Sequence, residues 1–369
     1  MHNNAFIVGK FLPPHLGHLA LIKAGHSVAK NVFVAVEQQP NEPLSASLRA
    51  LLMQQDVPQG VIVKPFLKTM PADPSLVDDE EKFWELWKKE IHELCPSIDV
   101  LLSSDDYGAR LAYDQLAQWV KVDRTAFPIS ATWLKGDFWE RMDNLMPTTR
   151  AFFTKRIALV GGESTGKSTL AKTLAHQLNT KHVPELAQQI IVANKLNPNK
   201  LTPKDLLSFS LSQKATRAGV LSLASRILFE DSNELTTAMF ARLLGFEDLA
   251  LDLTQQFLDN PPHHTIVCLK EGAVFHKDIH RLEHPSDGVD FIEQHTLNFL
   301  KKHNLSFSCV AGDWLSRTNQ ALDTVHQLKK QWETLDFPSH CEQAKASNLF
   351  VVSALPQDKK TSPVKAFKV

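Results

Sequence analysis

The stretch GGESTGKS, at residues 161–168, limits what this chain of 369 residues can fold into. It fits the pattern G-x-x-x-x-G-K-[ST], in which a glycine-rich loop joins a buried strand to a helix. The apolar run at residues 156–161 predicts that strand, and the pattern at residues 167–178 predicts the helix. Chance gives such a match in well under about 1% of chains of this length. The second half of the chain should therefore be an α/β domain built around a phosphate-binding loop.

The loop pattern gives its residues specific roles. Backbone amides of residues 162–167 are expected to surround the phosphates of ATP, the Lys167 ammonium to bridge the β and γ phosphates, and the Ser168 hydroxyl to bind Mg²⁺. The predicted ATP contacts of this half are Gly161, Gly162, Glu163, Ser164, Thr165, Gly166, Lys167, Ser168 and Thr169. ATP is thus the expected co-substrate and Mg²⁺ the expected cofactor.

Two later stretches favour a small-molecule kinase among the proteins that use this loop. RILFEDSNELTT, at residues 226–237, predicts a strand with an acidic end, where Asp231 could bind magnesium or take the proton of an attacking hydroxyl. The stretch at residues 278–288 has the composition of a kinase lid, with Arg281 placed to meet the transferred phosphoryl group. A solvated loop is an equally good interpretation of Arg281.

A second strand–loop–helix pattern opens the chain at GKFLPPHLGH, residues 9–18. Gly9 and Gly17 would let the backbone approach a ligand closely, and the amides of the first helical turn attract an anion. His15 and His18, three residues apart at a helix start, face the same way and could donate hydrogen bonds to one phosphoryl group. Two alternatives stay open: a zinc site, although no third ligand is visible nearby, and imidazoles that only cap or pack.

Short apolar runs alternate with helical patterns along both halves. Strands are predicted at residues 5–8, 32–36, 61–67, 100–102, 127–130, 156–161, 227–230, 265–269, 307–310 and 349–352. Helices are predicted at residues 16–29, 45–55, 80–94, 107–119, 132–142 and 167–178. Strands alternating with helices imply parallel sheets, in which ligands lie outside the carboxyl ends of the strands. The fold class expected is α/β with two domains.

The N-terminal motif also carries a resemblance to a known family. GKFLPPHLGH resembles the G-x-F-x-P-x-H-x-G-H signature of the nucleotidylyltransferases, and ISATWLK, at residues 129–135, resembles their second signature, I-S-x-T-x-x-R. LLSSDDYGARLA (101–112) and VDRTAFPISAT (122–132) are similar to the nicotinamide-mononucleotide adenylyltransferase domain of the NadR family. The resemblance implies that the 5′-phosphate of the mononucleotide attacks the α-phosphorus of ATP and expels pyrophosphate. That reaction needs hydrogen-bond donors and cations rather than a nucleophile on the protein.

The resemblance implies a set of site residues in this half. Catalytic roles fall to Lys10, His15, His18 and Lys135; ATP contacts to Gly9, Phe11, Gly17, Ser130 and Thr132; and substrate contacts to Trp84, Trp87, Ser104, Asp105, Tyr107 and Arg124. Lys135 stands where the signature has arginine, so it keeps the charge and loses the two-pronged donor set; a plain surface lysine is the other interpretation. The tryptophans could stack on the nicotinamide ring or belong to the core.

The resemblance to NadR extends from about residue 5 to about residue 330, and in the second half it implies a ribosylnicotinamide kinase. There the family usually has Asp-x-Asp where this chain has Asp231, Ser232 and Asn233, and Trp-Glu-x-x-Arg-Glu where it has PELAQQ, residues 184–189. Glu185 and Asn233 remain as predicted nucleoside contacts, and Gln188 and Gln189 replace charged residues. We expect a weaker grip on a charged, planar nucleoside, with kinase activity reduced, redirected or lost.

These expectations define the domains. We predict a Rossmann-like nucleotidylyltransferase domain over residues 1–150, with a boundary near 147–154 where the helical pattern is interrupted, a P-loop kinase domain over residues 151–345, and a C-terminal strand with a basic tail over residues 346–369. Only about four residues precede the first predicted strand, so the DNA-binding domain that NadR repressors carry ahead of the transferase is not expected.

Composition narrows the partners. The chain has 40 Lys and Arg against 41 Asp and Glu, in no long block of one sign, so no nucleic-acid partner is expected. Four scattered cysteines and the lack of a signal-like or membrane-spanning apolar run favour a cytoplasmic protein with no membrane partner. The expected partners are ATP, nicotinamide mononucleotide, ribosylnicotinamide and NAD; a homo-oligomer stays open.

The leading hypothesis is a bifunctional enzyme of NAD salvage, with adenylyl transfer in the first domain and phosphorylation of ribosylnicotinamide in the second. An alternative couples adenylyl transfer to riboflavin phosphorylation, but that kinase is not a P-loop protein. A third hypothesis makes the second domain a sensor that binds ATP or NAD without turnover and regulates the first. A kinase for another nucleoside is also left open.

Overall fold

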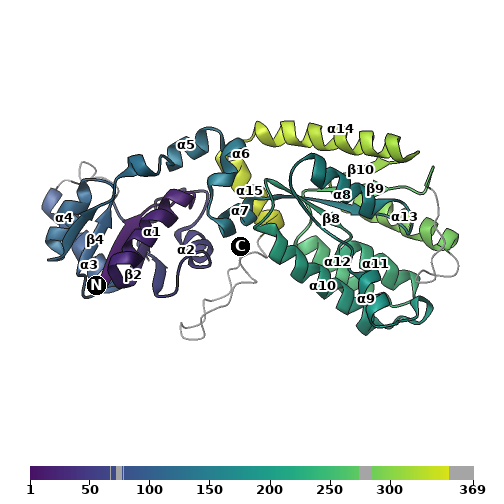
Figure 1. The fold of residues 1–369 in the computed structure, drawn as a ribbon, viewed down its shortest axis with the longest axis horizontal. Helices are drawn as coiled ribbons and strands as arrows, with labels where there is room; N and C mark the ends of the chain where they lie inside the picture. The colour runs from purple at the N-terminus through teal and green to yellow at the C-terminus, as the bar shows by residue number, and fades with distance from the viewer. Residues whose placement is uncertain (67, 72–76, 78, 274–284, 349–369) are drawn as a thin grey trace.

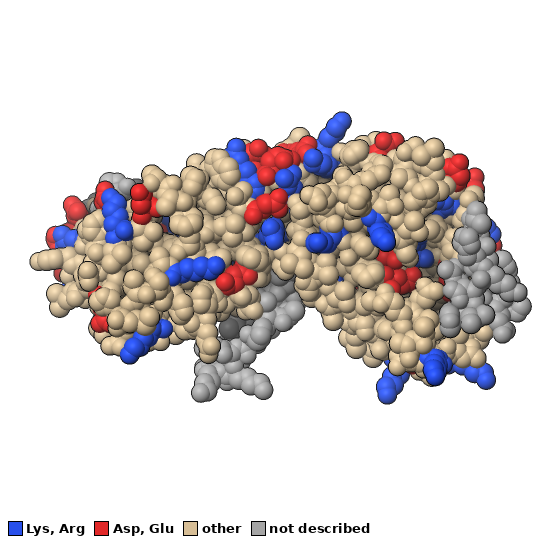
Figure 2. All heavy atoms as spheres, in the orientation of Figure 1, with Lys and Arg blue, Asp and Glu red and all other residues tan. Residues whose placement is uncertain are grey.

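The computed structural model describes residues 1–66, 68–71, 77, 79–273 and 285–348, except for the side chains of residues 124 and 285–287. Two α/β units lie side by side along the long axis of the molecule, each a parallel sheet with helices against it (Figure 1). Basic and acidic side chains are interspersed over the face drawn in Figure 2. Among the described residues, no helix is long and apolar enough to span a membrane.

The first unit is a five-stranded sheet of order β3-β2-β1-β4-β5, with every strand pair parallel. Its elements are β1 (His2–Gly9), α1 (Leu16–Val28), β2 (Ala29–Val36), α2 (Ala46–Gln54), β3 (Val61–Pro65), α3 (Glu80–Leu94), β4 (Val100–Ser103), α4 (Tyr107–Asp114) and β5 (Gln118–Lys121). The chain order reverses at β1, so the loops after β1 and β4 diverge and leave a crevice at the carboxyl edge of the sheet.

Short helices carry the chain from the first sheet to the second. They are α5 (Ala131–Gly136), α6 (Phe138–Arg141) and α7 (Pro147–Phe153), with 3-10 turns at Arg124–Ala126 and Met142–Asn144. Helices α6 and α7 contact α14 and α15 from the end of the chain, at the centre of the molecule (Figure 1).

The second unit is a five-stranded parallel sheet of order β10-β9-β6-β8-β7. Its elements are β6 (Lys155–Val160), α8 (Lys167–Gln177), β7 (Lys181–Val183), α9 (Ala187–Ala193), α10 (Pro203–Leu221), β8 (Ile227–Asp231), α11 (Glu234–Leu243), α12 (Glu247–Asp259), β9 (His264–Cys268), α13 (Pro285–Lys302), β10 (Phe307–Val310), α14 (Trp314–Glu333) and α15 (Phe337–Asn348). A 3-10 turn at Pro198–Lys200 lies between α9 and α10. The first strand, β6, is central and buried along its whole length.

The predicted α/β class is confirmed, and most predicted elements occur within a few residues of their expected limits. The prediction for the fifth strand of the first sheet was wrong. The helix expected at 107–119 ends at Asp114, because Leu116 takes a left-handed backbone (φ 55) and the Ala117 amide bonds back to Ala112. The following residues form β5, a half-exposed edge strand with a weak apolar signal. Residues 127–130 join no sheet.

Two further predictions need correction near the middle of the chain. The helix expected at 132–142 is broken into α5 and α6 at Asp137, which has non-helical angles (φ −153, ψ 67). The stretch expected to interrupt the helical pattern, 147–154, is itself helix α7, with Pro147 at its first position, where no amide hydrogen bond is lost. Strand β7 was not predicted from the sequence. The strand predicted at 349–352 lies outside the described residues.

A single apolar cluster joins the two sheets. It runs from Leu52 and Leu134 of the first unit through Trp139 and Phe152 to Ile157 and beyond in the second. Helix α15 packs against α7 and closes this cluster from the carboxyl-terminal side. Because the core is continuous across residue 150, the domain limits stated above stay a proposal.

One buried cation sits against this shared core. The Lys155 side chain is fully buried, and its Nζ donates to Gln343 Oε1 at 2.6 Å. Burial lowers the pKa of Lys155 to about 7, far below the value of an exposed lysine. Since the unfolded chain binds this proton more tightly, the free energy of unfolding should rise as the pH increases from about 7 toward about 10.

We therefore predict that Lys155→Met stabilises the protein at pH 7 and removes this part of the pH dependence. Methionine keeps the long apolar stem without a charge to desolvate. Thermal unfolding should show a midpoint several degrees above that of the parent at pH 7, with a gap that narrows toward pH 9.5. A variant less stable than the parent at pH 7, or a gap independent of pH, would contradict this account.

Candidate nucleotide sites

The first unit holds a cavity of about 790 Å³ at the carboxyl ends of its strands. It gathers predicted site residues that are far apart in the sequence. Its lining includes Gly9, Lys10, Phe11, His15, Gly17, His18, Trp84, Trp87, Ser104, Asp105, Tyr107, Ser130, Thr132 and Lys135. Arg124 lies in the turn before α5, and its side chain is outside the described part of the chain. The cavity is large enough for a nucleotide.

The two histidines lie together at the start of α1. Their rings stack with centroids 3.5 Å apart and planes 23° apart. The backbone amide of His15 donates to Nδ1 of His18 at 3.2 Å, so a neutral His18 carries its proton on Nε2. His18 is therefore in the tautomer that can donate from the far side of its ring. Both residues line the cavity, so they are not turned into an apolar interior.

The glycines of this motif make room for neighbouring rings. A Cβ on Gly17 would lie 3.1 Å from the His15 ring and 3.2 Å from the carbonyl of Ile129. A Cβ on Gly9 would contact the Phe11 ring at 3.4 Å. Glycine at these two positions thus leaves room for the His15 and Phe11 rings, and close approach of the backbone to a ligand stays a prediction.

Cationic and hydroxyl groups border the same cavity. Lys10 lies at the end of β1, and Lys135 lies in α5 with its Nζ 6.0 Å from the Phe337 ring of α15. The Ser130 hydroxyl caps α5 by accepting from the amide of Trp133 at 3.1 Å. Glu37, also in the lining, has a pKa raised by burial. Cationic donors and a carboxylate therefore face one space.

The two predicted tryptophans differ in their surroundings. Trp87 is buried among Phe66 and Phe83 and donates from its indole to the carbonyl of Pro71 at 3.2 Å. Trp84 is half-buried, and the guanidinium of Arg110 lies 5.5 Å from its ring centre. Both edge the cavity, but Trp87 is mainly a core residue. A ligand contact by either stays a prediction.

Several residues that line this cavity were not predicted from the sequence: Glu37, Arg110, Asp123 and Phe127. Arg110 is held by Asp114 and Glu81, each at 3.1–3.2 Å. It lies within a stretch already quoted for its resemblance, and an arginine one helical turn after Tyr107 was the available signal. Phe127 is half exposed although apolar, and it lines the cavity.

The second unit holds a cavity of about 600 Å³ beside the loop that follows β6. Residues 163–169 form one wall, as predicted. Gly161 (φ 146) and Gly166 (φ 86) adopt backbones that favour glycine, and a Cβ on Gly161 would lie 2.4 Å from the carbonyl of Cys268. Gly161 and Gly162, also predicted as ATP contacts, are not among the residues that line the cavity. Lys167 begins α8, and its Nζ donates to the carbonyl of Gly162 at 2.8 Å.

Asp231 lies at the end of β8, next to the phosphate-binding loop. Burial raises its pKa, while the Lys167 charge and hydrogen bonds from Ser168 and from the amide of Glu185 act in the opposite direction. A hydroxyl and a carboxylate that contact each other here are oxygen ligands of the kind Mg²⁺ takes beside nucleotide phosphates. Among the described residues there is no cluster of three His, Cys, Asp or Glu side chains that would hold a metal alone.

Part of the second cavity is lined by apolar side chains, here called the apolar lobe. The lobe is lined by Ile191, Pro198, Leu201, Leu206, Phe209, Phe240 and Leu244. Glu185, Gln188 and Asn233 lie along it, so the predicted contacts Glu185 and Asn233 do face this space. Arg281 lies outside the described residues.

Trp314 and Arg317 of α14 also line this cavity and were not predicted. The buried Arg317 guanidinium donates to the carbonyls of Thr165, Glu271 and Gly312 at 3.1, 2.5 and 2.8 Å. It thereby joins the phosphate-binding loop to the loops after β9 and β10. The signal was present in a stretch quoted for its resemblance, but three backbone carbonyls brought together by the fold cannot be seen in a sequence.

The comparisons with known proteins agree with this geometry. Residues 156–317 match the family described as AAA domain. The chain is 22% identical over 351 residues to the trifunctional NAD biosynthesis/regulator protein NadR of Escherichia coli (strain K12), covering 87% of this chain and 82% of that protein. The NadR protein of Salmonella typhimurium is 22% identical over 88% of this chain and 83% of its own.

Solved structures of NadR have the same fold. A crystal structure of NadR in complex with NR superposes with a TM-score of 0.69 at 20% identity, covering 88% of this chain and 96% of the other. A structure of NadR in complex with NAD and AMP-PNP gives a TM-score of 0.68 at 18% identity, covering 89% and 97%. The sequence matches agree with the resemblance predicted from the motifs, and the solved structures show that this chain shares the NadR fold across both of its α/β units.

Proposed function

We propose that this protein makes NAD by two ATP-dependent reactions at two separate cavities. Adenylyl transfer to nicotinamide mononucleotide takes place in the first unit, and phosphorylation of ribosylnicotinamide takes place in the second. The observation that carries the proposal is the presence of two cavities, each where a central parallel strand leads into the amino end of a helix, with no residue common to their linings. The NAD-biosynthesis function named for the NadR relatives supports it.

In the first cavity the work of the protein is to position two anions. A phosphate oxygen of the mononucleotide forms a bond to the α-phosphorus of ATP, the bond from that phosphorus to the bridging oxygen breaks, and pyrophosphate leaves. His18 Nε2–H and the His15 ring would donate to the α-phosphoryl oxygens, and Lys10 and Lys135 would balance charge on the leaving group; all four residues line the cavity. No bond to the protein is formed.

In the second cavity a sugar hydroxyl attacks the γ-phosphorus of ATP. The bond from the hydroxyl oxygen to the γ-phosphorus forms, the bond from that phosphorus to the β–γ bridging oxygen breaks, ADP leaves, and the hydroxyl proton passes to water. Lys167 and the loop amides would hold the phosphates, and Ser168 with Asp231 would hold Mg²⁺, which neutralises charge on the phosphate oxygens when bound.

We also propose a reducing cytoplasmic compartment, which suits four unpaired cysteines.

A second candidate function is a sensor domain that binds ATP without turnover. It is favoured by Asn233, Gln188 and Gln189, since none of them carries a charge. Purified protein given ATP, magnesium and ribosylnicotinamide separates the two: formation of the mononucleotide supports the kinase, and tight ATP binding without product supports the sensor.

His18→Ala should lower adenylyl transfer by roughly a hundredfold or more, the usual loss for one donor to a developing charge. Release of pyrophosphate with ATP and nicotinamide mononucleotide as substrates measures this. ATP binding in the second unit should be unchanged, and it serves as the control for folding. Absence of NAD formation by the parent protein would remove the adenylyltransferase proposal itself.

Lys167→Ala should have the converse effect. Loss of the ammonium that meets the β and γ phosphates should reduce phosphoryl transfer by a hundredfold or more, while adenylyl transfer continues at the parent rate. Both rates are measured on one preparation. If either alanine variant lost both reactions while remaining folded, the two cavities would not be independent.

Asp231→Asn should weaken the use of magnesium in the second cavity. Asparagine keeps the shape and an acceptor for Ser168, but it removes the negative charge. We expect phosphoryl transfer to fall at least about tenfold and to need more Mg²⁺ for half-maximal rate, while the magnesium dependence of adenylyl transfer is unchanged. Equal Mg²⁺ requirements in the parent and the variant would show that Asp231 has another role.

A further inference from the structure

The turn between β8 and α11 holds buried polar atoms that have no hydrogen-bond partner among the described residues. Asp231 Oδ1, Ser232 Oγ, Asn233 Nδ2 and Thr236 Oγ1 are buried, and none has a hydrogen-bond partner among the described residues. Buried polar atoms are nearly always paired, so four of them within six residues require an explanation. Because Ser232, Asn233 and Thr236 line the 600 Å³ cavity, a molecule bound there could supply the missing partners.

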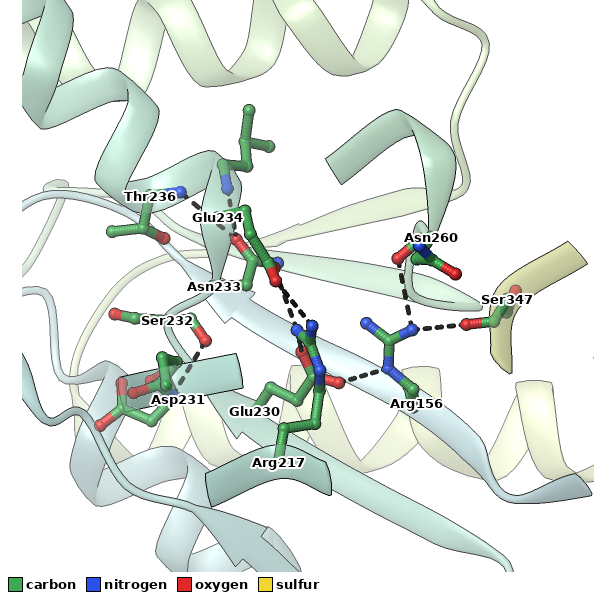
Figure 3. Close-up of polar contacts among 12 residues, drawn as sticks. Arg156, Arg217, Glu230, Asp231, Ser232, Asn233, Glu234, Thr236, Asn260 and Ser347 are labelled. Atoms are coloured by element: carbon green, nitrogen blue, oxygen red, sulfur yellow. Dashed lines mark hydrogen bonds and ion pairs between the residues drawn. The ribbon is translucent and has the colours of Figure 1, made fainter. Parts of the chain in front are cut away.

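The side chain of Asn233 is fixed in orientation. Its Oδ1 accepts from the amides of Leu235 at 3.0 Å and Thr236 at 3.3 Å, which caps α11 (Figure 3). Backbone amides can only donate, so the oxygen must face the helix and Nδ2 must point elsewhere. The residue is 1% exposed. Position 233 therefore offers the cavity wall a neutral donor, and it cannot offer an acceptor without losing the cap.

The turn around Asn233 is rigid. Ser232 has a left-handed backbone (φ 74), which a residue with a side chain rarely adopts. Gln213 Nε2 donates to the carbonyls of Asp231 at 3.0 Å and Ser232 at 3.3 Å, and the Ser232 amide donates to Leu159. Such strain persists where the surroundings enforce it, and it is often found at ligand sites.

The turn adds no negative charge to the cavity beyond Asp231. Glu234 is bound by Arg217 through two hydrogen bonds of 3.0 and 2.6 Å, and it does not line the cavity (Figure 3). Arg217 also contacts Glu230, which is bound in turn by Arg156 at 2.5 Å. This buried group of two arginines and two glutamates has no net charge, and it lies behind the turn.

We propose that Asn233 sets the substrate specificity of the second cavity: its amide donates to a hydroxyl oxygen of the nucleoside, and the uncharged side chain at this position lets the cavity accept nucleosides with an uncharged base at least as well as cationic ones. The apolar lobe formed by Leu206, Phe209 and Phe240 suits a planar ring with no charge. The acidic residues in the cavity lining are Glu163, Glu185 and Asp313, and none of them belongs to the turn that carries Asn233. The inference rests on the proposed binding of nucleosides in this cavity.

Ribosylnicotinamide and its 1,4-dihydro form test the proposal, because they share the sugar and nearly the same shape and differ by one positive charge. The kcat/KM of each is measured with ATP and Mg²⁺ for the parent, Asn233→Asp and Asn233→Ser at pH 8. Aspartate keeps the cap and replaces the free donor by a charged acceptor; serine keeps the cap and stays neutral. The same proteins are assayed for adenylyl transfer as a control for folding.

The parent should use the dihydro form at least as efficiently as the cation. Asn233→Asp should raise the ratio of kcat/KM for the cation over that for the dihydro form by about tenfold, because a carboxylate within a few ångströms attracts the pyridinium charge. Asn233→Ser should lower both values and leave the ratio unchanged. A parent that prefers the cation tenfold, or a ratio that Asn233→Asp does not change, overturns the proposal.

Binding separates this inference from the kinase proposal. The affinity for both nucleosides is measured by calorimetry in the presence of a non-hydrolysable ATP analogue and Mg²⁺. If no phosphorylated product forms but the ratio of dissociation constants shifts in Asn233→Asp as described, the specificity proposal holds and the kinase proposal fails. If neither nucleoside binds to the parent, the specificity proposal fails.

Discussion

The parallel pairing of all strands in both sheets is the constraint on which the two cavities depend. Parallel strands place every carboxyl end at one edge, so the loops that follow them share that edge. In each sheet the first strand is internal, β1 between β2 and β4 and β6 between β8 and β9. The loop after that strand therefore lies where its neighbours diverge, and the amino end of the next helix faces the opening. Residues separated by more than 100 positions, such as His15 and Thr132, meet there.

The second unit has three carboxylates close together beside its phosphate-binding loop. Glu230, Asp231 and Glu234 fall within five consecutive residues, at the end of β8 and the start of α11. These residues lie next to the predicted phosphate site. Unpaired carboxylates there would oppose the binding of a polyanion, and burying them without partners costs several kcal/mol each. Arg156 and Arg217 take two of them, and Lys167 with Ser168 takes the third. Arg156 Nη1 also donates to the carbonyl of Ser347, so the end of α15 is tied to this group.

Local sequence motifs allowed much of the fold and of the two candidate sites to be predicted. The phosphate-binding loop, the histidine pair and the strand before each of them follow from short-range rules, because a loop of fixed glycine spacing between strand and helix has few conformations. The elements that were wrongly predicted depend on tertiary contacts. Strand β5 has a weak pattern and exists because β4 offers an edge, and α7 is helical because Phe152 and Phe153 are buried in a core shared with α15. Such tertiary contacts cannot be recognised from the local sequence.

The orientation of several site side chains could not be predicted from the sequence either. Arg110 was visible as an arginine, but its place over Trp84 depends on how α4 packs against α3. Arg317 gains its role from three carbonyls on three loops. Asn233 was predicted as a contact from its position in the motif, and only the structure shows that its oxygen is committed to the cap. The sequence thus specifies which groups are present, and the packing specifies which atom of each group is available.

The shape of the second cavity bears on whether its domain is a kinase or a sensor. A domain that only binds ATP needs room for the phosphates, the sugar and one base. Here the same cavity is lined both by the phosphate-binding loop and by apolar side chains, with Ser232 and Asn233 of the β8–α11 turn, and Asp231 of that turn interacts with Lys167. A second molecule in the lobe would meet the γ-phosphate end of ATP, where Lys167 is expected. Buried polar atoms without described partners are costly to keep, so a turn that holds four of them next to this lobe is better explained by a bound acceptor than by ATP alone.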